Sequence, residues 1–316
     1  MDRLAAMRVF VAVVDAQGFS AASRALSMSL PTVCRKVAEL ESHLGAQLLV
    51  RSTRKVTVTD SGRRYYEEVR RILDDVGDAE SRVSGEFQAP KGRLSITAPT
   101  LFGRLHALPI IDDFMKIHPD ISVRLMLTNY VVDLLEEHID LGIRIGALSD
   151  RSSVTLEVRS VRQIVCASPG YLSQHGRPLS PRDLSRHLCV TFPSAGTPPD
   201  WAFKMPSGKI RRFPVSTRLT LNSIEGNVQS ALRGGGLVQL YAYQAAPHLA
   251  EGTLETVLDR YEIEPTPVNI VYPHGRLVPL KVRAFIDFAL PRLRDRLGVV
   301  DRQCSAPRKT APADVS

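Results

Sequence analysis

The chain has 316 residues, of which 44% are hydrophobic and 23% are charged, and its formal net charge at pH 7 is +8. This composition excludes a wholly disordered chain, and the length predicts two or three domains of ordinary size. Because no apolar run approaches the ~20 residues that a membrane-spanning helix needs, the sequence argues against a membrane protein.

Three helices are predicted at the N-terminus. Apolar residues recur at helical spacing from Leu4 to Val14, and Gly18 breaks the run. Ser20 is expected to cap a second, short helix, and Ser29 a third that tolerates Pro31 in its first turn and ends at Gly45. Since the apolar stretch carries acidic residues and no small-residue cleavage site follows it, we do not expect a signal peptide.

The third helix has one apolar stripe and one polar face. The stripe is formed by Val33, Val37, Leu40 and Leu44. Thr32, Arg35 and Lys36 lie away from it. Two helices joined by about three residues, the second with a small polar and basic outer face, are typical of a helix-turn-helix.

A wing and a long helix are predicted next. Residues 48–59 alternate apolar and polar side chains around a basic tip, which indicates a two-stranded hairpin. Thr59 or Asp60 can cap a helix over 61–87 whose narrow apolar seam predicts pairing with a second copy of the chain. The alternative is that this helix packs on its own C-terminal domain.

The charge is unevenly distributed along these segments. Residues 1–65 hold ten Lys/Arg against five Asp/Glu, whereas residues 66–88 hold three against seven. A basic segment followed by an acidic one indicates two elements with different partners, the first suited to an acidic molecule such as DNA.

After Ala89–Gly92 the pattern changes to alternating strands and helices. In the first half we expect strands at 93–98, 121–128 and 140–146 and helices at 102–118 and 131–138, an order that implies a parallel sheet. A second α/β unit follows, with a hairpin around 204–212, and a final helix over 277–297 closes the fold. The polar, Pro/Ala-rich segment 301–316 is expected to be a disordered tail.

The sequence resembles the LysR-type transcriptional regulators from about Leu4 to Leu297. The resemblance rests on FVAVVDAQGFSAASRAL, on the S-x-P-x-V-x-R pattern at 29–35, on LLVRSTRKVTVTDSG at 48–62 and on CASPGYL and VYPHGR in the second half. Three positions depart from the family pattern. Leu30 stands where the family usually has Gln, Cys34 where it usually has Ser, and His138 where Gly is common.

The resemblance implies a fold of mixed α+β and α/β class with four segments. These are a winged helix-turn-helix (1–59), a linker and dimerisation helix (60–89), an effector-binding domain like periplasmic binding proteins (90–300) and the tail. The effector-binding domain divides into subdomain I (about 90–161 and 267–300) and subdomain II (about 162–266).

The implied function is that of a bacterial regulator. Its expected partners are double-stranded DNA with a partly palindromic operator, a small-molecule effector and further copies of the chain in a homodimer or homotetramer, with RNA polymerase as another candidate. The family also implies a cytoplasmic, nucleoid-associated location. No cofactor other than a small-molecule co-inducer is expected, and no metal.

The candidate DNA contacts combine the outer face of the third helix, the wing and two helix starts. Lys and Arg there would displace condensed counterions, Thr32 and Arg35 would face the major groove, and Arg54 or Lys55 would approach the minor groove. On charge alone, ordinary solvated side chains are the alternative. The residues are Ser20, Ser29, Thr32, Arg35, Lys36, Arg51, Thr53, Arg54 and Lys55.

The candidate effector contacts follow the parallel strands, because loops at the carboxyl ends of such strands face the ligand crevice. Arg144 is the expected partner of a carboxylate, with pairing to Glu136 or Asp140 as the alternative. For the aromatic members the alternative is a place in the core. The residues are Thr100, Phe102, Thr128, Arg144, Gly146, Phe192, Trp201 and Asn222.

Two other classes of protein were weighed against a regulator. The sequence lacks the GxGxxG, GxSxG and HExxH motifs, and its eight His are scattered, so no catalytic cluster supports an enzyme. An α/β ligand-binding protein, or an enzyme, with a helical dimerisation arm is the alternative. The four Cys have no disulfide or metal spacing and predict reduced thiols, and redox sensing at Cys34 is a minor alternative.

Overall fold

A computed structural model describes residues 1–51, 56–83, 89–146, 153–193, 199–274 and 278–305. The chain forms two units, Met1–Ala89 and Pro90–Ser316, which we call the head unit and the effector domain. The division falls at the Ala89-Pro90 break from which a domain boundary was expected.

The head unit contains three short helices. The first begins after Asp2, whose carboxylate accepts a hydrogen bond from the Ala5 N–H (3.1 Å), and the third ends at Gly45 in the left-handed conformation (φ 63°). The predicted cap at Ser20 is wrong, because the second helix begins at Phe19 with Gly18 as its cap, two residues earlier than predicted. The helices are α1 (Arg3–Asp15), α2 (Phe19–Ala25) and α3 (Leu30–Leu44).

The apolar faces of these helices meet in one core. The predicted stripe of α3 is buried except for Leu44, which is exposed at the last turn. Tyr65 and Tyr66 of the following helix pack against the same core. Its buried members are Ala6, Val9, Phe10, Val13, Ala22, Val33, Val37, Leu40, Leu48 and Leu49.

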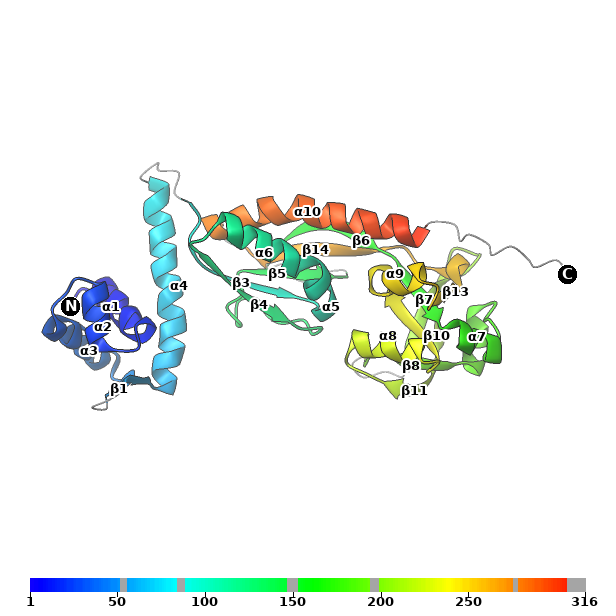
Figure 1. The fold of residues 1–316 in the computed structure, drawn as a ribbon, viewed down its shortest axis with the longest axis horizontal. Coiled ribbons are helices and arrows are strands. Elements are labelled where there is room, and N and C mark those ends of the chain that lie inside the picture. Colours follow the sequence, from blue (N-terminus) through cyan, green and yellow to red (C-terminus); the bar gives the residue numbers. More distant parts are fainter. Residues whose placement is uncertain (52–55, 84–88, 147–152, 194–198, 275–277, 306–316) are drawn as a thin grey trace. The chain divides into compact units, whose positions relative to one another are not determined.

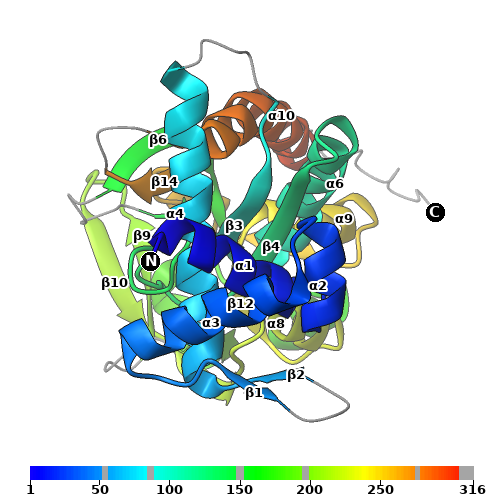
Figure 2. The ribbon, with the colours of Figure 1, turned by 90° about the vertical axis from the view of Figure 1, so that its left-hand side faces the viewer.

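The wing is formed by two antiparallel strands, β1 (Leu49–Arg51) and β2 (Val56–Val58), as predicted (Figure 2). Helix α4 (Asp60–Val83) follows at once. Thr59 caps it, because its hydroxyl accepts the Gly62 N–H at 2.9 Å. The predicted helix extended to residue 87, and residues 84–88 lie outside the described part.

Among the described residues no single helix is long and apolar enough to cross a bilayer, and only the bent pair α1 and α2 passes such a test jointly, by length and composition.

The effector domain contains two five-stranded sheets (Figure 1). Subdomain I is built on the sheet β4-β3-β5-β14-β6. The parallel order predicted for β4, β3 and β5 is correct, and β14 runs antiparallel to both of its neighbours in the same sheet, β5 and β6. The strands are β3 (Gly92–Ala98), β4 (Ile121–Leu127), β5 (Leu141–Ile145), β6 (Ser153–Val161) and β14 (Thr266–Pro273).

Helices α6 and α10 pack against the sheet of subdomain I, to which both belong (Figure 1). The predicted helix over 102–118 is interrupted by a π-helical turn, η1 (Gly103–Ala107), between α5 (Thr100–Phe102) and α6 (Leu108–Ile117). Helix α10 (Leu280–Ser305) extends into the segment predicted as a disordered tail, of which residues 306–316 lie outside the described part.

The predicted helix over 131–138 is wrong. This segment forms a single turn: the Asp133 carboxylate accepts hydrogen bonds from the N–H groups of Leu135 (2.8 Å) and Glu136 (3.0 Å), as at a helix start, but the Ile139 N–H bonds to the Leu134 carbonyl (2.8 Å) and ends the turn. His138, where the resemblance expected glycine, then adopts a left-handed conformation (φ 54°) and redirects the chain.

Subdomain II repeats the pattern of subdomain I in the sheet β11-β8-β12-β7-β13. Its strands β11, β8 and β12 are parallel, and β7 runs antiparallel to both of its neighbours, β12 and β13. The predicted hairpin is present as β9 (Asp200–Lys204) and β10 (Ile210–Pro214). The sheet strands are β7 (Gln163–Ala167), β8 (Leu188–Thr191), β11 (Ser216–Thr220), β12 (Leu237–Tyr241) and β13 (Glu255–Val257).

Helices cover both faces of this second sheet. One core is formed with α8 and α9, and the other, which contains Trp201, lies beneath α7, η2 and the hairpin. The helical elements are α7 (Pro169–His175), η2 (Pro181–Arg186), α8 (Ile224–Leu232), α9 (Ala242–Ala250) and η3 (Asp259–Tyr261).

Gly62→Ala is expected to destabilise the head unit. A Cβ atom at this position would lie 2.1 Å from the Leu48 carbonyl oxygen and 2.9 Å from its carbon, and this backbone cannot shift without disrupting the wing. We expect a loss of about 1–3 kcal/mol in the free energy of unfolding, typical of an overpacked site.

Urea unfolding followed by circular dichroism measures this loss, and fluorescence of Trp201, the single tryptophan, reports the effector domain separately. The control is Gly77→Ala, where a Cβ would have no atom within 4 Å and where alanine favours the helix. Equal midpoints for the two variants would contradict the account of Gly62.

Candidate functional site

The outer face of α3 is polar and accessible. Arg35 is exposed, and its surface ion pair with Glu39 (3.8 Å) is too weak to hold its side chain in place. Lys36 and Thr32 are half-buried on the same helix. The Ser29 and Thr32 hydroxyls are 2.8 Å apart, so Ser29 fixes the start of the face.

Other candidate DNA contacts surround this helix. Ser20 is exposed on α2, and the backbone of Arg51 ends strand β1. Thr53, Arg54 and Lys55 lie outside the described residues, so the structure does not place the tip of the wing. Leu30, the first residue of α3, is 41% exposed and lies beside the polar face.

Glu41 holds the wing against α3. Its carboxylate Oε1 accepts hydrogen bonds from the N–H groups of Leu48 (2.8 Å) and Leu49 (3.0 Å), at the point where the chain enters β1. The Thr59 hydroxyl lies within hydrogen-bond distance of the carbonyl oxygens of Gln47 (2.7 Å) and Leu48 (3.1 Å). These contacts fix the wing strands relative to the polar face of α3.

Helix α4 is joined to α1 by a second polar cluster. The Tyr66 hydroxyl donates to the Asp15 carboxylate, and Arg70 Nη1 lies 2.8 Å from Tyr66 Oη and 3.8 Å from Asp15 Oδ1. Burial is the largest factor that raises the pKa of Tyr66. Because Val69 is buried against the head while Ile72 is 40% exposed, the head covers only the first part of the α4 seam.

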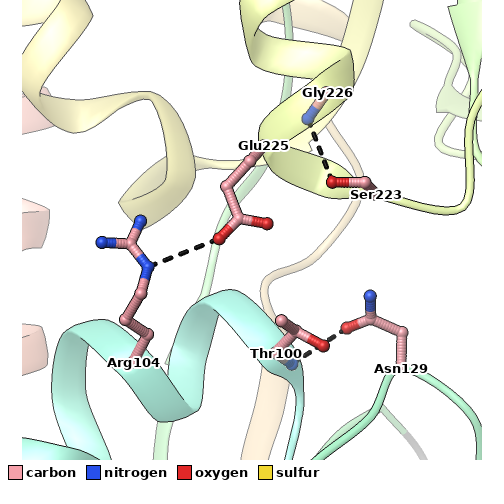
Figure 3. Close-up of polar contacts among 6 residues, drawn as sticks. All are labelled: Thr100, Arg104, Asn129, Ser223, Glu225 and Gly226. Atoms are coloured by element: carbon pink, nitrogen blue, oxygen red, sulfur yellow. Dashed lines mark hydrogen bonds and ion pairs between the residues drawn. The ribbon is translucent and has the colours of Figure 1, made fainter.

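A charged pair joins the two subdomains of the effector domain, and a side-chain cap of a helix start lies within each of them (Figure 3). Arg104 of η1 points towards Glu225 of α8, with 3.4 Å between Nε and Oε1. The Thr100 N–H at the start of α5 donates to the Asn129 side chain (3.0 Å), and the Gly226 N–H donates to Ser223 (3.2 Å). Both helix starts are therefore capped by side-chain oxygens.

The polar effector candidates of subdomain I lie at the ends of its parallel strands. Thr128 follows β4, and its hydroxyl accepts the Tyr130 N–H. Gly146 follows β5 and pairs with the backbone of Pro267. Arg144 is buried in β5 and donates to the Val132 carbonyl (3.2 Å), and burial lowers its pKa. Among the described residues Arg144 makes no ion pair.

The remaining candidates do not form one cluster with these. Phe102 is fully buried in the core of subdomain I, and Trp201 is 6% exposed in a core of subdomain II, so packing accounts for both rings. Phe192 is half-buried and Asn222 is exposed before α8. Effector contact by any of the candidates stays a prediction.

A paired linker lies where the chain passes between the subdomains. Arg162, between β6 and β7, donates from Nε and Nη2 to the Glu262 carboxylate at 3.0 and 2.8 Å, and Glu262 lies on the return path to β14. This two-bond geometry fixes both linkers together. No sequence pattern indicates the Arg162–Glu262 and Arg104–Glu225 pairs, whose partners are 100 and 121 residues apart. The role of Glu41 is not indicated either, because its partners are backbone N–H groups, which no side-chain spacing records.

Metal ligands and free thiols are the remaining groups that could carry chemistry. No group of three or more His, Cys, Asp or Glu that could hold a metal ion occurs in the part of the chain that the structure describes. Cys34 is a half-buried free thiol on α3. Burial raises the pKa of Cys166 and Cys189 to about 12, so both thiols stay protonated.

Comparisons with known proteins match both units. The family model "Bacterial regulatory helix-turn-helix protein, lysR family" matches residues 4–63, and the model "LysR substrate binding domain" matches residues 87–294. An HTH-type transcriptional regulator of Xanthomonas campestris pv. campestris is 34% identical over 302 residues, which span 94% of this chain and 88% of that protein.

Solved structures are similar in fold. The regulator CrgA from Neisseria meningitidis, described as a LysR-type transcriptional regulator, is 31% identical with a TM-score of 0.59, over 91% of this chain and 98% of that one. The Vibrio cholerae virulence activator AphB is 26% identical with a TM-score of 0.58, again over 91% of this chain and 98% of that one.

Glu262→Gln is expected to lower the stability of the effector domain by about 1–2 kcal/mol, because the amide keeps the shape but loses the charge-assisted pairing with Arg162. Urea unfolding followed by Trp201 fluorescence measures this. Glu264→Gln is the matched control, since its ion pair with Lys204 is exposed and should contribute little. Equal effects would show that the linker pair is dispensable.

Proposed function

The chain belongs to the LysR family of helix-turn-helix transcriptional regulators, and from this premise we propose that two paired heads read a partly palindromic operator under the control of a small molecule. The observation that carries the proposal is the exposed polar face of α3 on a helix-turn-helix with its wing. The chain acts in this proposal by binding, without catalysis, in the bacterial cytoplasm where the nucleoid DNA lies.

The head reads DNA with α3 in the major groove. Arg35 contacts base edges or phosphates, Lys36 and the basic wing neutralise phosphates, and Ser20, Ser29 and Thr32 position the helix. Leu30 replaces a family glutamine with an exposed apolar side chain, which suits contact with a thymine methyl group. This substitution changes which base the start of the helix prefers.

Pairing of two chains uses the part of α4 that the head leaves uncovered. Ile72 and Ala79 are exposed and Val76 is half-buried on the same seam. A repeat of apolar residues three and four apart is what a two-helix seam requires. Homodimers formed in this way place two α3 helices on successive half-sites, and a homotetramer would join two such pairs.

The small molecule binds where the subdomains meet, near Thr100, Thr128 and the start of α8. A match to a substrate-binding domain supports this location, as does the carboxyl-end position of the candidate residues in the sheets. An effector that prefers one arrangement of the subdomains shifts the population towards it and so changes operator binding. Contact with RNA polymerase would convert this change into transcription.

Arg35→Ala is expected to weaken operator binding by 10- to 100-fold, in line with the ~1–3 kcal/mol that a good base contact contributes. Gel shifts on fragments that flank the gene measure the affinity, and a salt series separates phosphate contact from base contact. Arg218→Ala, which removes an exposed arginine from the effector domain, is the control. Unchanged affinity for Arg35→Ala would mean that α3 is not the recognition helix.

Ile72→Glu is expected to dissociate the paired chains, because two carboxylates cannot be buried in one apolar seam. Light scattering after size exclusion, at micromolar concentration, measures the mass, which should fall to that of a smaller assembly. Arg63→Glu alters charge on the opposite side of the same helix and should leave the mass unchanged. A wild-type mass for Ile72→Glu would favour a different interface.

A further inference from the structure

The imidazole of His106 is buried where the subdomains meet. It lies on the π-helical turn η1 of subdomain I and is 6% exposed. Its ring centroid is 4.9 Å from that of Phe102 and 5.4 Å from that of Tyr243, which belongs to α9 of subdomain II. Tyr243 is itself buried in the core of subdomain I, so this aromatic contact joins the two halves of the domain.

Neither ring nitrogen of His106 has a hydrogen-bond partner among the described residues. A neutral imidazole has one N–H to donate and one nitrogen that accepts, and leaving such groups buried and unpaired costs free energy. Buried polar groups without partners are uncommon and call for an explanation. π-helical turns of this kind are themselves unfavourable and often occur at functional positions.

The surroundings of the His106 ring oppose its protonation. Burial is the main cause that lowers the pKa of His106 to about 4, and the positive charge of Arg296 on α10 adds to it. Glu225 acts on Tyr243 and not on the imidazole. The acidic residues of α6, Asp112 and Asp113, are exposed, and α5 and β3 contribute no charged group that acts on the ring.

We propose that His106 is a proton-sensitive contact between the subdomains: protonation of its imidazole separates the π-helical turn from Tyr243 and shifts the effector domain away from the arrangement seen here. A protonated ring has two N–H donors and a charge, and the aromatic pocket can accommodate neither. Water reaches the ring once Tyr243 withdraws.

The direction and size of the effect follow from linkage. The packed arrangement binds fewer protons than an open one, so it is favoured near neutral pH and weakens as the pH falls from 6.5 towards 4. Between pH 7 and pH 5 the balance between open and packed forms should change by roughly 20-fold. This behaviour belongs to the protein without effector, and only its link to transcription rests on the proposed function.

Hydrogen exchange of the full-length protein at pH 7 and pH 5, corrected for the intrinsic exchange rate, tests the proposal. Peptides that cover η1 and α9 should lose protection by roughly 20-fold in the wild type. In His106→Phe, whose ring cannot be protonated, the pH dependence of these peptides should disappear. His118→Gln, a substitution of a half-buried histidine at the end of α6, is the control and should keep the wild-type response.

A second measurement does not depend on the folding of His106→Phe. Titration of ¹³C-labelled histidines should assign to His106 a midpoint near 4 in the wild type and one closer to 6.5 in Tyr243→Ala, where the ring loses its cover. A wild-type midpoint near 6.5, or a pH response that survives in His106→Phe, overturns the proposal. Either result leaves DNA binding and effector binding unaffected as proposals.

Discussion

The backbone of Leu48 connects the parts of the head unit that must act together on DNA. Its N–H is bonded to Glu41 from α3, its carbonyl lies within hydrogen-bond distance of the Thr59 hydroxyl, and Gly62 of α4 packs directly over that carbonyl. Helix α3, the wing and helix α4 therefore meet at the backbone of one residue. The arrangement explains why a small residue is needed at position 62 and why the Glu41 carboxylate is bonded to the backbone of the wing.

The effector domain depends on a different constraint, since its two subdomains have separate sheets and are held together by linkers and by packing such as that of α9 against α10. Two linkers cross between them and are joined by Arg162 and Glu262. Other contacts are of different strength: the Arg104–Glu225 pair is exposed, whereas Tyr243 and His106 are buried. The partners of a surface ion pair can each bond to water instead, at little cost in free energy. A buried aromatic contact cannot loosen gradually, because closely packed rings are either in contact or apart. The Arg162–Glu262 pair thus fixes the linkers, while the Arg104–Glu225 and His106–Tyr243 contacts can be broken without breaking that pair.

Periodicity predicted the head unit well, because each helix there has one buried face and the spacing of Val33, Val37 and Leu40 records it directly. It failed at 131–138, where His138 in the left-handed conformation ends the turn, and it could not show that β14 runs antiparallel to both β5 and β6. The effector candidates were placed by topology alone, which does not distinguish a core ring such as Phe102 from a ligand contact. Pairs such as Arg162 and Glu262 are a hundred residues apart, and no single-sequence pattern connects them.

Helix α4 begins directly after the wing and is bonded to α1 through Tyr66 and Asp15, so α3 and α4 belong to one connected unit. In the homodimer proposed above, the distance between the two α3 helices would therefore be set by α4. Operators with half-sites at another separation would then fit poorly, whichever bases they carry. A regulator built in this way recognises the phase of the double helix as well as its sequence.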